Sequence, residues 1–436
     1  MSVMLPKEIN YSLPVSLPSG CESIDVNVLP SNGTTFSCNG SIVQFDLPMR
    51  AGFADFKTLS IRYKGAVVAG GISKIRCTPL YAPISRLEVL FGSQVAQNVN
   101  NYGQVMNMLT NCRFNVADKI GSIAGYGWKL EGENNVMSLQ GCDGRSCAVN
   151  DVFSLYGPLP CILSEADRYL PTGLMGSIRV QLTLDTIANI FAPAGLSLTY
   201  NSETGVPFSS NTAVPTEFTL SDFVLSYSMV TLGSEVDNAV RSMGDKITIK
   251  SQSYSNSSNA LPIGTNGQIE LIYSQKMASV KSLFLHCSSN STNGIFDAYE
   301  ITNGGDLQFS IASKLYPSRP LSSAVAHRGT LQLELKKALG SLYDKKNSMS
   351  INTQEYLTLG TASTVVNPAK VYYAVNTQTI QSNDVLLSGV STQNSPITCR
   401  INFGTPTTAT VNASLISAFD CLIEIEPSTK SARVIQ

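Results

Sequence analysis

The stretch RYLPTGLMGSIRVQLTLD, residues 168–185, limits the fold of this chain more than any other feature. After a Pro-Thr-Gly turn, Ile178, Val180, Leu182 and Leu184 alternate with polar residues. Because successive side chains of a β-strand point to opposite faces, these four apolar side chains share one face of a sheet. The chain has too few helix-period patterns to cover such faces with helices, so a second sheet is expected to cover them. The pattern therefore predicts a β-sandwich.

The same alternation recurs along the chain and predicts an all-β protein with short flanking helices. The strands predicted in the first half are 41–47, 59–63, 84–91, 152–156, 178–184 and 218–232. Those predicted in the second half are 247–250, 267–273, 280–286, 307–311, 371–375, 397–403 and 419–425. Apolar residues at helical spacing predict helices at 102–109, 233–243 and 331–340.

The two halves repeat one order of elements. In each half a strand, 84–91 or 307–311, leads through a short link to a helix, 102–109 or 331–340. The offset of roughly 220 to 225 residues indicates a duplicated domain, because solenoid repeats run from about 20 to 50 residues. We therefore predict two tandem jelly-roll β-sandwiches, a double jelly roll.

The domain boundaries follow from composition and pattern. Residues 1–38 are rich in Pro, Ser and Asn and lack clear periodicity, which predicts an extended N-terminal arm. The predicted first jelly roll is 39–245, and the predicted second is 246–436. We expect the arm to become ordered only against neighbouring molecules.

Composition limits the kinds of partner. Charged residues make up 14% of the chain and the net charge is −1, whereas an average soluble domain is roughly 25% charged. A surface that relies on uncharged polar residues suits a protein that buries much of its exterior against copies of itself. Neither end carries a Lys/Arg-rich arm, so we expect neither a strong grip on phosphates nor direct sequence-specific binding of nucleic acid.

The N-terminal sequence lacks the charged and apolar regions of a secretory signal, and no apolar run reaches the eighteen or more residues of a membrane span. Synthesis in the cytosol or nucleus is expected, so the ten cysteines should be reduced. Most are predicted to be small core residues: Cys77, Cys161, Cys399 and Cys421. Cys142 and Cys147 flank a short loop; a zinc site would need a second ligand pair, and a disulfide formed after release from a cell is the more plausible special role.

No catalytic constellation is found. The only two histidines, His286 and His327, lie in different patterned elements, which disfavours the metal site of an enzymatic jelly roll. His327 precedes a helix and is interpreted as a capping or interface residue. Glu424 and Glu426 share a strand face, as a glycosidase pair could, but a solvated face is the simpler interpretation. Without nucleotide or nucleophile motifs either, we predict no catalytic, cofactor-binding or metal-binding residues, no cofactor and no enzymatic activity.

Four short motifs carry a more specific resemblance. They are ISRLEV at 84–89, NYGQVMNML at 101–109, YLPTGLMG at 169–176 before the strand 178–184, and LYPSRP at 315–320 before the helix 331–340. In this order they resemble the double jelly-roll major capsid proteins of polinton-like viruses, virophages and related adenovirus-lineage DNA viruses of eukaryotes. The resemblance covers most of residues 40–430. The chain is compact beside the larger members of that family, so prominent tower loops are not expected.

The resemblance implies a non-enzymatic structural protein of the virion. Three copies of the chain would form a homotrimer, a pseudo-hexameric capsomer that tiles an icosahedral capsid together with neighbouring capsomers and with penton and minor capsid proteins. Synthesis in the host cytoplasm, with assembly in the cytoplasm or nucleus, is expected. We also expect the irregular stretches 112–150 and 342–367 to face the particle exterior or the trimer axis.

Three other functions fit some of the pattern. A secreted or surface tandem β-sandwich, such as an adhesin or a lectin-like binding module, is the main alternative, although the missing signal sequence disfavours it. An enzyme of glycan metabolism would depend on Glu424. A single jelly-roll capsid protein of an RNA virus is disfavoured by the duplication and by the missing basic arm.

Overall fold

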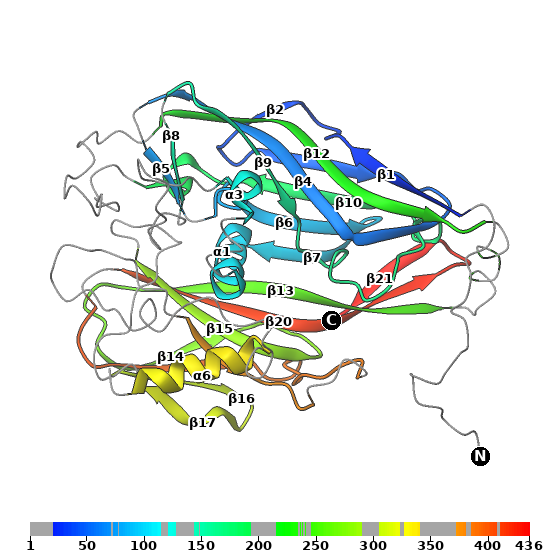
Figure 1. Ribbon diagram of the computed structural model, residues 1–436. Helices are drawn as coiled ribbons and strands as arrows, with labels where there is room; N and C mark the ends of the chain where they lie inside the picture. The colour runs from blue at the N-terminus through cyan, green and yellow to red at the C-terminus, as the bar shows by residue number, and fades with distance from the viewer. Residues whose placement is uncertain are drawn as a thin grey trace, which may run out of the picture.

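The chain is built from antiparallel strands arranged in two similar units (Figure 1). The computed structural model describes residues 21–70, 73–76, 78–114, 121–127, 144–147, 149–192, 215–233, 236, 238, 240, 246–289, 305–322, 327–340, 372–380, 385–407 and 410–436.

The first unit is a sandwich of two sheets. One sheet has the order β1-β12-β4-β9, with a short β2 also paired to β12, and the other has the order β3-β10-β6-β7. The strands are β1 (Glu22–Val28), β2 (Thr35–Ser37), β3 (Ile42–Leu47), β4 (Phe53–Ala69), β6 (Ile84–Phe91), β7 (Gln94–Asn100), β9 (Val152–Pro158), β10 (Ile178–Leu184) and β12 (Glu217–Thr231). A separate small sheet joins β5 (Ser73–Arg76), β8 (Gly144–Cys147) and β11 (Phe191–Ala192).

The second unit repeats this arrangement. Its sheets have the orders β13-β20-β15-β18 and β14-β19-β16-β17, and β21 pairs with the far end of β20. The strands are β13 (Ile247–Leu261), β14 (Gly267–Tyr273), β15 (Val280–Ser289), β16 (Asp306–Ile311), β17 (Lys314–Ser322), β18 (Tyr373–Asn376), β19 (Ile397–Phe403), β20 (Val411–Glu426) and β21 (Ser431–Ile435). If β2 and the strands of the small sheet are set aside, each unit pairs its first, eighth, third and sixth strands, and its second, seventh, fourth and fifth. This order defines a jelly roll, so the predicted double jelly roll is confirmed.

The stretch that predicted a sandwich wall forms the centre of a sheet. β10 lies between β3 and β6, where Val180 is opposite Phe45 on one side and Val89 on the other. Its alternate side chains are buried, as the period of two requires. Phe223 of β12 in the facing sheet packs against Phe45, with ring centroids 6.5 Å apart, so the two sheets share one core.

Helices flank the rolls where the sequence predicts them. The long ones are α1 (Tyr102–Arg113) and α6 (Arg328–Ala338), and each follows the fifth strand of its roll. Short turns of helix add α3 (Ile123–Tyr126), α4 (Ile187–Ile190) and η2 (Thr172–Leu174). Of the helix predicted at 233–243, the structure describes three helical positions, 236, 238 and 240.

The predicted arm needs correction. Residues 22–28 pair along their whole length with β12, and residues 35–37 pair with it further along, so both belong to the first jelly roll. Phe36 and Val26 are buried in its core. The extended-arm interpretation is therefore wrong for residues 22–37, because alternate apolar side chains in this polar stretch complete the sheet. Residues 1–20 lie outside the described residues.

Two edge strands also differ from the prediction. Residues 94–100 and 314–322, interpreted as polar links, form β7 and β17 at the edges of their sheets. β17 contains Pro317 and Pro320, which an edge strand tolerates because one side of its backbone has no neighbouring strand to bond. Strands at the edge of a sheet bury fewer of their side chains than central strands do. Apolar and polar residues therefore alternate less clearly along them.

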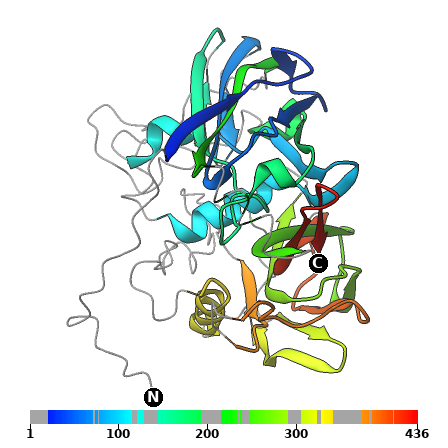
Figure 2. The same ribbon diagram turned by 90° about the vertical axis from the view of Figure 1, so that its right-hand side faces the viewer.

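The two rolls pack directly against each other. Helix α1 lies between them, and the hairpin of β20 and β21 extends from the second roll towards β6 and β7 of the first (Figures 1 and 2). α6 lies on the outside of the second roll (Figure 2).

Candidate functional site: the joint between the two jelly rolls

Many of the buried polar side chains in the described part of the chain lie at the contact between the two rolls. The first roll contributes β7, α1 and the segment 159–167 that follows β9. The second contributes the outer face of β13, β15 and β20. Every residue of α1 from Tyr102 to Cys112 is buried, although the helix carries five amide or hydroxyl side chains. A helix that is buried on all its faces must pack against protein on more than one side, and here the two rolls cover it.

A chain of hydrogen bonds crosses the joint through amide groups. Asn256 of β13 donates from Nδ2 to Oε1 of Gln104 at 3.3 Å, and Gln104 of α1 donates from Nε2 to Nδ1 of His286 at 2.6 Å. Asn256 also donates to the backbone oxygen of Asn100. All three side chains of this relay are buried. Gln104 both accepts and donates, and Asn256 donates twice, so the relay fixes the orientation of α1 on the second roll.

His286 is a structural residue in this relay. Its ring lies 5.4 Å from the ring of Tyr372, and its Nε2 has no hydrogen-bond partner among the described residues. Burial lowers the pKa of His286 from 6.5 to about 4, so the imidazole is neutral at pH 7. Among the described residues, no group of three or more His, Cys, Asp or Glu side chains is suited to hold a metal ion.

We expect His286 to make the fold sensitive to mild acid. The unfolded chain takes up a proton near pH 6.5, whereas the folded chain resists until about pH 4, so stability falls as pH decreases through this window. Between pH 7 and pH 5 the loss should be about 2 kcal/mol. Urea unfolding at both pH values measures it. In His286→Gln, which keeps an acceptor for Gln104, the difference should shrink to a fraction; an unchanged difference would contradict the assignment.

Gln97 makes a second bridge between the rolls. From β7 it donates from Nε2 to the Ser253 hydroxyl of β13 at 2.8 Å and accepts at Oε1 from the backbone N–H of Ile162 at 2.8 Å. The Ser251 hydroxyl donates in turn to the Ile162 carbonyl at 2.6 Å, and the N–H of Asp167 donates to the carbonyl of Lys250 at 3.0 Å. The segment 159–167 is therefore bonded to β13 at Ile162 and Asp167.

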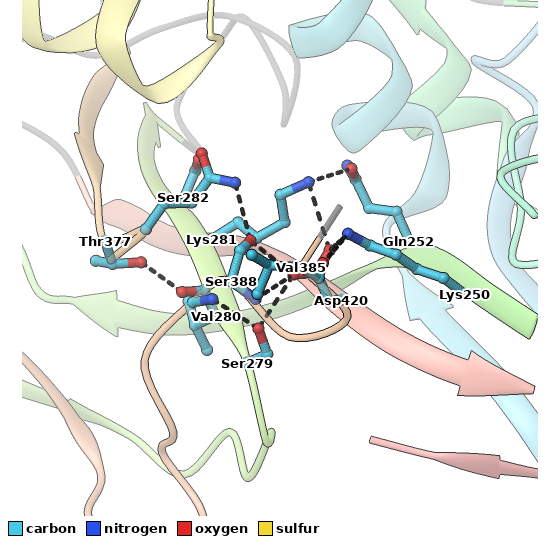
Figure 3. A network of polar contacts seen from close by, with 12 residues as sticks. Lys250, Gln252, Ser279, Val280, Lys281, Ser282, Thr377, Val385, Ser388 and Asp420 are labelled. Carbon is cyan, nitrogen blue, oxygen red and sulfur yellow. Dashed lines mark hydrogen bonds and ion pairs between the residues drawn. The ribbon is translucent and has the colours of Figure 1, made fainter. Parts of the chain in front are cut away.

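A buried carboxylate organises the second roll at the end of this contact (Figure 3). Asp420 of β20 is fully buried, and its Oδ2 accepts from the Ser279 hydroxyl at 3.2 Å and from both the N–H and the hydroxyl of Ser388, at 2.9 and 2.8 Å. Its Oδ1 faces the Nζ of Lys281 at 3.4 Å and the Nζ of Lys250 at 4.0 Å.

The two lysines also donate hydrogen bonds to other acceptors. Lys281 donates to Gln252 Oε1 at 3.1 Å, and Lys250 donates to the Val385 carbonyl at 2.6 Å. The cluster thus joins β13, β15, β20 and the segment 385–390. Its geometry is that of a structural anchor. Oδ2 accepts three hydrogen bonds, and Oδ1, which accepts none from the described residues, faces the two lysine ammonium groups.

The C-terminal hairpin adds a third attachment. Glu424 of β20 binds Lys246 at 2.7 Å and Arg433 of β21 at 2.6 Å. The hydrogen bonds from Lys246 and Arg433 hold the pKa of Glu424 below its usual value. Gln436 then donates to the Ala96 carbonyl of β7 in the first roll at 2.8 Å. The solvated-face interpretation is wrong for Glu424, because these two cations cover it; Glu426 remains partly exposed.

The remaining predicted positions have simple roles. His327 occupies the N-cap of α6, but its side chain makes no capping hydrogen bond and is exposed, so the capping half of the interpretation is wrong. Cys161, Cys399 and Cys421 are buried as expected, and Cys77 lies outside the described residues. Cys142 also lies outside them, as do residues 342–367 and most of 112–150, so the disulfide and the outward-facing loops stay predictions. No helix of the described part of the chain is long and apolar enough to cross a membrane.

The joint itself was not foreseen. Gln97, Gln104 and Asn256 occupy positions that a single-roll pattern assigns to solvent. The available signal was the crowding of amide side chains in NYGQVMNMLTNC, which would weaken an ordinary surface helix.

Comparison with known proteins identifies the fold but no relative by sequence. No family model matches the chain, and no curated protein matches it. Among solved structures, the Faustovirus major capsid protein has a TM-score of 0.62 at 10% identity, covering 98% of this chain and 93% of its own. The VP54 protein of virus PBCV-1, fitted into a reconstruction of the virophage Sputnik, has a TM-score of 0.60 at 9% identity, covering 98% and 99%. A chain of the Sputnik virophage structure has a TM-score of 0.58 at 11% identity, covering 100% and 92%.

Proposed function

We propose that this chain is a non-enzymatic major capsid protein whose homotrimers are the pseudo-hexameric capsomers of an icosahedral virion. The observation that carries the proposal is the joint: two rolls of identical strand order are packed through unlike surfaces, the edge and helix of one against the sheet face of the other. The full-length similarity of fold to capsid structures supports it.

A contact between unlike surfaces can be repeated. Heterologous contacts form a closed ring when the rotation between successive units closes, and an open filament when it does not. Each chain already contains one such contact and carries two rolls, so three chains supply six rolls for a ring that is close to sixfold. The first roll of each chain would then receive the second roll of its neighbour.

The finer assignments belong to the same proposal. Neighbouring capsomers, penton proteins and minor capsid proteins are the proposed partners, and the chain does not bind nucleic acid sequence-specifically. The proposed location is the virion, with assembly in the host cytoplasm or nucleus. We keep residue 245 as the proposed boundary between the rolls, because it lies in the connection from β12 to β13.

Native mass spectrometry and negative-stain imaging of the purified full chain test the proposal. The expected mass is three times 46.7 kDa, and the expected image is a hexagonal plate. A tandem β-sandwich adhesin would stay monomeric or dimeric and would give no plates. A monomer at micromolar and at higher concentrations, with no plates, would refute the capsomer.

A further inference from the structure

Helices α1 and α6 both follow the fifth strand of their rolls but differ in what covers them. α1 is buried from Tyr102 to Cys112 between the two rolls. α6 buries Leu331, Leu335 and Ala338 against its own roll, where the Ser282 hydroxyl donates to the Ala338 carbonyl at 2.7 Å. Its outer side carries Leu333, which is 41% exposed. α6 therefore has one packed side, where α1 has two.

The segments that follow the sixth strand differ in the same way. In the first roll this segment is 159–167, whose Ile162 and Leu163 are fully buried and which bonds to β13 of the second roll. In the second roll the described part of this segment is 377–380 and 385–390, which exposes three large apolar side chains. These are Ile380 at 54%, Leu386 at 57% and Leu387 at 39%. The second roll thus exposes apolar side chains on the counterparts of α1 and of the segment 159–167, two of the three elements with which the first roll makes the joint.

The complementary surface is the outer face of the sheet β1-β12-β4-β9. In the second roll, the equivalent face of β13-β20-β15-β18 receives α1. In the first roll, this face is hollowed by a depression of about 460 Å³ between Leu29, Arg62, Lys64, Ser154 and Asp222. Lys64 and Asp222 form an exposed ion pair of 2.8 Å at this depression.

Apolar side chains continue this face beside the depression. Val152 of β9 is 67% exposed and Val68 of β4 is 44% exposed, and the β4–β9 pairing brings their strands together. The face therefore combines a hollow, an ion pair and exposed valines, which is the mixture found at protein interfaces with an apolar centre and a polar rim.

We propose that this hollow receives α6 of a second copy of the chain, with Leu333 inserted beside the Lys64–Asp222 pair and residues 385–390 lying along β1. The contact repeats the joint inside the chain, between chains. It rests on the proposed trimer, and it specifies which surfaces make that trimer. Pro317 and Pro320 of β17 interrupt the strand edge, so side chains and not a continuous sheet form the contact.

Site-directed crosslinking between two differently labelled chains tests the docking. Chains with Leu333→Cys are mixed with chains with Ser154→Cys, reassembled, and treated with a short bis-maleimide. The expected result is a covalent dimer in the mixture and none in either variant alone, while the double variant reaches a covalent trimer. The control partner is Ile42→Cys on β3, which is similarly exposed at 44% but lies in the opposite sheet. It should give no covalent dimer with Leu333→Cys.

The outcomes separate the docking from the trimer itself. If native mass spectrometry gives a trimer for the unsubstituted chain and Leu333→Cys crosslinks to Ile42→Cys instead, or to neither, the docking is overturned and the trimer stands. If the unsubstituted chain is not a trimer, the proposed function fails and the docking fails with it.

A charge substitution gives an independent readout. Leu333→Asp should raise the trimer dissociation constant at least tenfold and leave the unfolding midpoint of the isolated chain unchanged, because Leu333 is exposed there. Ile263→Asp, at a side chain that is 66% exposed outside the contact, should leave the trimer intact. Equal dissociation constants for the two variants would overturn the docking.

Discussion

Replacing Phe223 by alanine is expected to lower the free energy of unfolding by about 3–5 kcal/mol, the range for deleting a large aromatic side chain from a packed core. Phe223 is 2% exposed. Its ring lies 4.8 Å from that of Tyr63, stacked, and 5.7 Å from that of Phe36, edge to face. Phe45 approaches it from the other sheet. One side chain therefore joins β2, β3, β4 and β12, and its loss leaves a cavity that touches both sheets of the first roll.

Guanidinium unfolding followed by tyrosine fluorescence measures this loss. The control is Tyr169→Ala, at a side chain that is 47% exposed, for which we expect a change within about 0.5 kcal/mol. If the two variants unfolded at the same denaturant concentration, the aromatic cluster would not be the centre of the first roll. Because Phe36 belongs to this cluster, Phe36→Ala should also destabilise the isolated chain, which an arm ordered only by neighbours would not.

The sequence predicts correctly those strands that have one face in a core and the other face polar. β6, β10, β14 and β19 were located to the residue, because one face of each packs in a core and the other is polar. α1 and α6 were found for the equivalent reason at helical period. The duplication followed from the order of these elements, because each half repeats a strand, a short link and a helix.

The predictions fail where a second unit covers a polar surface. β13 was predicted for four residues and runs for 15, because its continuation SQSYSNSSNAL carries polar side chains that pair with the first roll. Asn256 and Gln104 have polar side chains, and both are buried. The residue pattern along one strand contains no information about a surface that another domain supplies. The joint between the rolls therefore cannot be predicted from such patterns.

Asp420 illustrates the same limit. It lies in the predicted strand 419–425, between Phe419 and Cys421 in the core, and the alternation assigns it to the solvent side. The structure buries that side under Lys250, Lys281 and Ser388. A lone acidic residue on the polar face of a strand is usually exposed to solvent. Asp420 differs because lysines from β13 and β15 lie over it.

Replacing Asp420 by alanine is expected to lower the free energy of unfolding by about 3 kcal/mol, at the lower end of the range for removing one partner of a buried ion pair. The substitution leaves the Ser279 hydroxyl and both Ser388 donors without their acceptor. It also leaves two lysines facing each other across the vacated position. Their side chains keep 16% and 23% exposure, so water relieves part of the cost, and this places the effect below the maximum.

Urea unfolding of three variants separates the charge from the hydrogen bonds. Asp420→Asn keeps an oxygen acceptor and removes the charge, so its loss should lie between those of the wild type and Asp420→Ala. Asp25→Ala removes an exposed carboxylate that accepts one bond from Ser228 at 2.9 Å, and should cost less than about 1 kcal/mol. Should Asp420→Ala be no more costly than Asp25→Ala, the network would not anchor the sheet. Because the Lys250 carbonyl also accepts from Asp167 of the first roll, we further expect Asp420→Ala to speed hydrogen exchange at the Asp167 amide, while Asp25→Ala leaves that amide protected.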